Sequence, residues 1–174
     1  MSKLKTKNLK LKNGFTLMEV MVAIFIIVVG LFAVMALIDK SIMAGSLSTN
    51  KLIAANLAQE GIEVVKSIRD MSYDPATGGW DVWYGASGVA SGTYSVEHNS
   101  QNFGSSQNSL LKFDSASGLY SYSSGNNSIF KRSIIITKAP AGNADEIKVE
   151  AIVTWTERGA NKTLTVEDRL WNWR

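Results

Sequence analysis

The feature that most constrains this chain is an apolar segment near its start. Residues 20–38, VMVAIFIIVVGLFAVMALI, contain no charged residue and no proline. As a helix, the stretch from Phe15 to Ile38 would be about 36 Å long, which is enough to cross a hydrocarbon core of about 30 Å. The sequence therefore predicts one membrane-spanning helix, and the remaining chain has room for about one small domain.

The charge distribution predicts how this segment is oriented. The chain carries a net charge of +3, but five lysines lie before Gly14, where there is no acidic residue, so the rest is slightly acidic. Under the positive-inside rule, this basic start keeps the amino terminus in the cytoplasm. The basic pI therefore belongs to the leader, and we expect no nucleic-acid partner. The leader lysines are Lys3, Lys5, Lys7, Lys10 and Lys12.

An amphipathic pattern follows the apolar segment. Apolar or small residues recur at spacings of three and four, which marks one face of a helix. No proline occurs before Pro75, so the sequence predicts one helix from Phe15 to about Asp70. Residues 15–38 would span the membrane, and residues 39–70 would need a packing partner. The amphipathic face comprises Leu47, Ala54, Leu57, Ala58, Gly61, Val64, Val65 and Ile68.

An acidic residue, Glu19, lies near the start of the apolar segment. An ionisable side chain costs about 2.5 to 3.5 kcal/mol at a bilayer centre and less near the headgroups, so Glu19 either reaches water at the interface or has a functional partner.

The apolar segment fits three kinds of targeting signal: a secretory signal, a permanent signal anchor, or a leader cut before the apolar run. A signal cut after Ala36 lacks good small-residue positions, which disfavours the first alternative.

The string KNGFTLMEV, residues 12–20, combines a basic leader, Gly14, Phe15 and Glu19 ahead of the apolar run. This combination resembles the class III signal of type IV prepilins and of type II secretion pseudopilins. The resemblance implies that a prepilin peptidase cleaves between Gly14 and Phe15, removes residues 1–14 and methylates the amino group of Phe15. It also implies that Glu19 of one subunit meets the Phe15 ammonium of a neighbour and sets the axial register of the assembly.

Two further features refine this resemblance. Gly30 costs about 1 kcal/mol relative to alanine in a helix, so it is either tolerated or allows close helix packing. The lack of proline in the span, together with LAQEGIEVVKSIRD, resembles minor rather than major pilins. The implied protein is a minor subunit that joins or primes a type IV pilus after leaving the cytoplasmic membrane. Alternatives are a type II secretion pseudopilin and a signal-anchored ectodomain that binds a ligand.

Residues 71–174 read as a loop-rich β domain. Strand-like runs occur at GTYSVE, SLLKF, LYSYS, IFKRSIIITK, DEIKVEAIVTWTE and NKTLTVEDRLW, and turn residues separate them. In the fifth run, Ile147, Val149, Ala151, Val153 and Trp155 alternate with mostly polar residues. An antiparallel sheet of about four or five strands, packed on the amphipathic half of the helix, would bury both apolar faces. We therefore expect an α+β, pilin-like fold.

The composition disfavours an enzyme, a cofactor and a metal site. The chain has no cysteine, its one histidine is His98, and no phosphate loop, zinc signature or nucleophile elbow occurs. The two acids Asp74 and Asp81 lack calcium-loop spacing, so we assign no metal.

Aromatic residues suggest one further surface. Trp80, Trp83 and Tyr84 in GGWDVWYG would either bind a ligand by ring stacking or fill the edge of a small sheet, as would the terminal Trp171 and Trp173.

Overall fold

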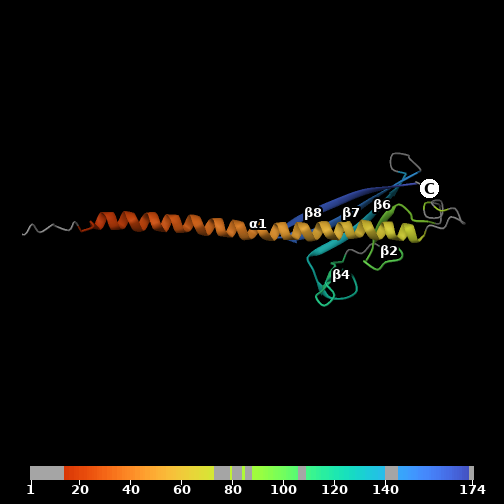
Figure 1. Ribbon diagram of the computed structural model, residues 1–174, viewed down its shortest axis with the longest axis horizontal. Helices are drawn as coiled ribbons and strands as arrows, with labels where there is room; N and C mark the ends of the chain where they lie inside the picture. The colour runs from red at the N-terminus through yellow and green to blue at the C-terminus, as the bar shows by residue number, and fades with distance from the viewer. Residues whose placement is uncertain are drawn as a thin grey trace, which may run out of the picture. The chain divides into compact units, whose positions relative to one another are not determined.

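The computed structural model describes residues 14–72, 79, 84, 88–105, 109–139 and 145–172. The chain forms two compact units, Met1–Ser46 and Leu47–Arg174. The first contains the start of helix α1 (Leu17–Met71), and the second contains the rest of that helix and the strands (Figure 1).

Helix α1 confirms the continuous helix expected from the hydrophobic pattern. It has 55 residues without a break, and it contains no proline. It ends at Met71, and the backbone N–H and hydroxyl of Ser72 both donate to the carbonyl oxygen of Ile68. In the described part of the chain, α1 is the one helix that is long and apolar enough to cross a membrane. The apolar side chains before its sheet-covered part are exposed, and the first buried residue is Ala54.

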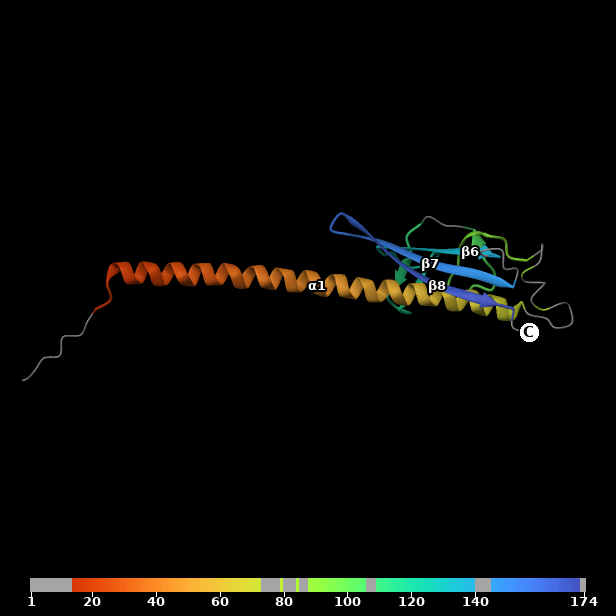
Figure 2. The same ribbon diagram turned by 90° about the horizontal axis from the view of Figure 1, so that it is seen from above.

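The larger sheet is antiparallel and has the strand order β2-β1-β6-β7-β8. Strands β6, β7 and β8 run side by side along the carboxyl-terminal part of α1 (Figure 2). Strands β7 and β8 pair from Glu146↔Trp171 to Glu157↔Ala160, which leaves β8 at one edge of the sheet. The five strands are β1 (Gly92–Ser95), β2 (Gly104–Ser105), β6 (Phe130–Lys138), β7 (Glu146–Glu157) and β8 (Ala160–Trp171).

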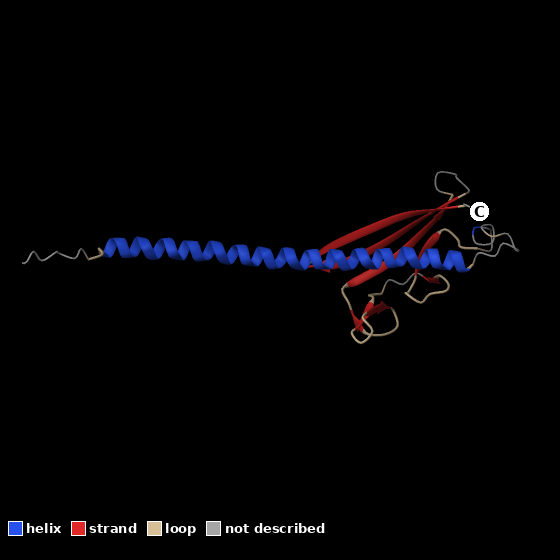
Figure 3. Cartoon of the chain, in the orientation of Figure 1, coloured by secondary structure: helices blue, strands red, loops and turns tan. Residues whose placement is uncertain are grey.

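A second, three-stranded sheet differs from the single sheet expected. It has the order β4-β3-β5 and is formed by β3 (Lys112–Asp114), β4 (Leu119–Ser121) and β5 (Asn126–Asn127) (Figure 3). The turn between β3 and β4 is held by Asp114, whose carboxylate accepts from the backbone N–H of Ala116 and the hydroxyl of Ser117. This local turn closes SLLKF and LYSYS into their own hairpin, so these strands do not extend the larger sheet.

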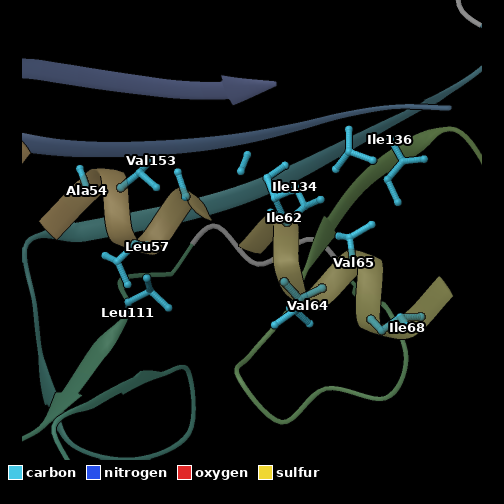
Figure 4. Close-up of a cluster of buried hydrophobic side chains, with 14 of the residues drawn as sticks. Ala54, Leu57, Ile62, Val64, Val65, Ile68, Leu111, Ile134, Ile136 and Val153 are labelled. Atoms are coloured by element: carbon cyan, nitrogen blue, oxygen red, sulfur yellow. The ribbon is translucent and has the colours of Figure 1, made fainter. Parts of the chain in front are cut away.

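The core lies between the carboxyl-terminal part of α1 and the larger sheet. Leu57, Ile62 and Val65 of the helix face Ile134 and Val153 of the strands (Figure 4). The predicted alternation in β7 is confirmed, because its apolar residues at odd positions from 147 to 155 are buried. On the predicted helix face, all residues from Ala54 to Ile68 are buried, and Leu47 is half-buried.

One glycine sets how closely helix and sheet approach. A Cβ added at Gly61 would lie 2.7 Å from Cδ1 of Ile134 and 3.3 Å from Cδ of Arg132. A distance of 2.7 Å is shorter than carbon packing allows, so a larger residue would require the end of the Ile134 side chain to shift within the core. The predicted place of Gly61 on the packing face therefore has a steric reason.

Candidate functional site: the start of α1

The start of α1 is built by a helix cap. Gly14, Phe15 and Thr16 precede the helix, and the backbone N–H of Glu19 donates to Oγ1 of Thr16 over 3.2 Å. The backbone N–H of Val20 donates to the carbonyl oxygen of Thr16, which starts the helical ladder. Thr16 is therefore the N-cap, and Glu19 occupies the third helical position. This cap was not predicted, although T-x-x-E before an apolar run is its usual signature in a sequence.

Glu19 lies in the first turn of α1 and is exposed. The positive end of the helix dipole is located there, so a carboxylate in this turn stabilises the helix start. Among the described residues, Glu19 forms no ion pair.

The cleavage junction expected at Gly14 and Phe15 lies outside the helix. Phe15 is 81% exposed, and an added Cβ at Gly14 would meet no atom within 4 Å. A peptidase needs a backbone segment that is not locked in helical hydrogen bonds, and Gly14 and Phe15, which precede the N-cap, meet this need. Gly30 lies further along the helix, and a Cβ at this position would also meet no atom within 4 Å. Among the described residues, no neighbour therefore occupies the space beside Gly30.

The aromatic surface proposed from the sequence is described only in part. Trp80 and Trp83 lie outside the described residues, as do Asp74, Asp81 and Trp173. The ring of Tyr84 faces the ammonium of Lys138, which lies 5.1 Å from the ring centroid. Trp171 is about half exposed at the end of β8, and His98 is exposed. Among the described residues, no group of three or more His, Asp or Glu side chains is placed to hold a metal ion.

A buried arginine attaches the strands to α1 in the second unit. The side chain of Arg132 in β6 has no exposed surface. Its guanidinium donates to the carbonyl oxygens of Leu57 and Val96 and pairs with Glu60 over 2.9 Å, whereas its Nε has no hydrogen-bond partner. The hydroxyl of Tyr122 donates to the carbonyl oxygen of Arg132, and burial raises the pKa of Tyr122.

The role of Arg132 was not predicted from the sequence. Its position in β6 could have revealed it, because side chains alternate along a strand and Arg132 falls on the same, buried face as Phe130, Ile134 and Ile136. A charged residue at an inward position is costly without partners, so its presence there indicates a hydrogen-bonded anchor.

The comparison with protein families identifies the amino-terminal segment. Residues 9–35 match the prokaryotic N-terminal methylation motif. This motif is the class III signal peptide of type IV pilin-like proteins, so the resemblance inferred from KNGFTLMEV is confirmed. No curated protein and no solved structure matches the chain.

The motif and the fold together define a class of protein. A methylation motif followed by an apolar helix, with antiparallel sheets packed on the later part of that helix, is an α+β, pilin-like arrangement. The motif supports a type IV pilin-like or pseudopilin precursor, which is a class of structural subunits rather than enzymes. It implies processing by a prepilin peptidase and pilin-like assembly, and with the apolar helix it fits a single-pass, membrane-anchored protein.

Proposed function

We propose that the protein is a minor pilin-like subunit that joins or primes a type IV pilus after cleavage between Gly14 and Phe15. The observation that carries this proposal is the match of residues 9–35 to the methylation motif. The matched residues include the start of α1, where the apolar side chains are exposed. An exposed apolar helix is stable in a lipid bilayer before assembly and against other helices after assembly.

Processing would change the charge at the start of α1. Cleavage removes the leader lysines and creates an ammonium at Phe15, two residues before the first helical residue. A cation at the positive end of a helix dipole is unfavourable. A carboxylate supplied by a neighbouring subunit would offset this, and Glu19 is the acidic residue in the first turn.

Pairing between Glu19 and a neighbour's Phe15 ammonium would fix the axial stagger of the helices. A buried charge without a partner costs about 3 to 5 kcal/mol, whereas a complete buried pair contributes little net stability. The pair would therefore act mainly by making arrangements with a different axial stagger less stable, because those leave the charges unpaired. Gly30, with open space where a Cβ would be, would allow another helix to approach closely.

The unbroken helix favours a minor subunit over a major one. Helix α1 runs from Leu17 to Met71 without a proline, so no residue forces a kink in the spanning segment. The cytoplasmic orientation of the amino terminus before assembly follows from the leader lysines.

The test is the incorporation of Glu19→Gln into filaments, with Asp39→Asn as the matched control. Both variants remove one exposed carboxylate of α1, but Asp39 lies after the apolar run. We expect Glu19→Gln to be cleaved normally and to be at least tenfold depleted from purified filaments, whereas Asp39→Asn is incorporated like the wild type. Incorporation of Glu19→Gln at the wild-type level would refute the register role.

A further inference from the structure

A pocket of about 330 Å³ lies on the face of the larger sheet that α1 does not cover. Lys131, Thr154 and Thr163 form one row of this pocket across β6, β7 and β8, because Lys131 pairs with Thr154 and Thr154 pairs with Thr163. Their neighbours along each strand pack in the core, which places the row on the outer face. Small-molecule sites have volumes of about 300 to 1,000 Å³, so the pocket has room for a small ligand. Its lining residues are Leu110, Ile129, Lys131, Thr154, Trp155, Thr156, Asn161 and Thr163.

The polar side chains of the pocket can both donate and accept hydrogen bonds. Thr154, Thr156 and Thr163 each contribute a hydroxyl, which has one donor and two acceptor sites. The hydroxyl of Thr156 donates to Oδ1 of Asn161 over 2.9 Å, and the amide nitrogen of Asn161 is a further donor. The lining contains one cation, Lys131, and no acidic side chain, which disfavours a positively charged ligand.

The place of the pocket in the sheet indicates which ligand these groups fit. Strand β7 is paired on both sides, so its main-chain polar groups are used within the sheet. A peptide that is recognised through its backbone adds to the edge of a sheet, whereas this pocket presents side-chain groups on the face of a central strand. Leu110 and Ile129 add an apolar wall, and Ile129 is 45% exposed. Hydroxyl groups beside an apolar wall match a sugar ring, which carries hydroxyls at its rim and C–H groups on its faces.

We propose that this pocket binds a neutral or acidic saccharide, with Thr154, Thr163 and Asn161 on the sugar hydroxyls and Ile129 against the ring face. Trp155 is only 4% exposed, so its ring has little surface for stacking on a sugar. We therefore expect weak binding, with a Kd of about 1 mM. The inference goes beyond the proposed filament role and does not depend on it.

Methyl NMR of the full-length chain in lipid nanodiscs, with labelled threonine and isoleucine methyl groups, tests the pocket. The probes are cellobiose, N,N′-diacetylchitobiose and digalacturonic acid. We expect at least one of them to shift the methyl signals of Thr154, Thr163 and Ile129. The signals of Thr165 and Ile135, which lie on the same face outside the pocket, should stay unchanged. No shift with any of the three probes, or equal shifts at Thr165 and Ile135, would overturn the proposal.

A matched pair of variants sharpens this test. Thr163→Val removes one pocket hydroxyl but keeps the side-chain shape and a high strand propensity, so the fold should be retained. We expect this variant to bind the shifting probe at least tenfold more weakly, because a hydrogen bond to the sugar is lost. The control is Thr165→Val, the same change on the same face of β8 outside the pocket, and it should bind like the wild type. An unchanged Kd for Thr163→Val, or an equal loss for Thr165→Val, would refute the saccharide site.

Discussion

The replacement Arg132→Met should weaken the attachment of α1 to the strands. It removes three N–H donations, to the carbonyl oxygens of Leu57 and Val96 and to the carboxylate of Glu60, while methionine fills most of the space. Hydrogen bonds to a charged group contribute about 1.5 to 3 kcal/mol each, and breaking a buried ion pair costs about 3 to 5 kcal/mol. The side chain of Glu60 is 31% exposed, so its carboxylate is hydrated once Arg132 is removed. We therefore expect the free energy of unfolding to fall by about 3 kcal/mol, the lower end of the range for a broken ion pair.

This loss is measurable as a shift in thermal stability. A loss of about 3 kcal/mol lowers the Tm of a unit of this size by about 12 °C. The assay is thermal unfolding of the full-length chain in detergent micelles, followed by near-ultraviolet circular dichroism. Lys162→Ala is the control, because it removes a positive charge from an exposed position of β8. A Tm of Arg132→Met within 3 °C of that control would refute the anchoring role.

Gly125→Ala should destabilise the fold more than Gly118→Ala, because both glycines have positive φ but an added Cβ at Gly125 would lie 2.5 Å from the carbonyl oxygen of Phe113, whereas Gly118 has open space. Equal losses of Tm would contradict this reasoning. The stabilisation by the salt bridge between Nζ of Lys66 and Oδ2 of Asp168, which are 2.9 Å apart, should depend on pH. Burial opposes ionisation of Asp168, but hydrogen bonds from Lys66 and Arg169 outweigh it and lower its pKa, and the bond to Asp168 raises the pKa of Lys66. The stabilisation is therefore lost as the pH falls below about 4 or rises above about 10.4. The Tm difference between the wild type and Asp168→Asn should shrink between about pH 5 and pH 2, and a constant difference would exclude the bridge as its source.

The sequence predicted the parts of the fold that have a clear hydrophobic period. The spacing of Leu57, Gly61 and Val65 predicted the packed face of α1, and alternation predicted which residues of β7 are buried. The runs SLLKF and LYSYS predicted the strands β3 and β4, but not that they form a sheet of their own. Strand β5 was not predicted, because its two residues are too few for a periodic signal.

The site was predictable to a similar degree. The residues of the motif, Gly14, Phe15 and Glu19, lie close together in the sequence, so the motif can be recognised without the structure. Thr16 was missed because the helix was predicted to begin at Phe15, one residue before this cap, whereas Arg132 was missed because its partners lie far away in the sequence. Non-local hydrogen bonds leave no periodic pattern, which explains why the anchor of α1 became visible only in the fold.

The most direct test of the account is the amino-terminal sequence and intact mass of the mature protein, expressed with and without a prepilin peptidase. With the peptidase, we predict a chain that begins at Phe15 and carries the added mass of one methyl group. Without it, the chain should begin at Met1. A chain that keeps Met1 in both cases would contradict the account and favour a permanent signal anchor, and a start after Ala36 would remove Glu19 and contradict the filament role.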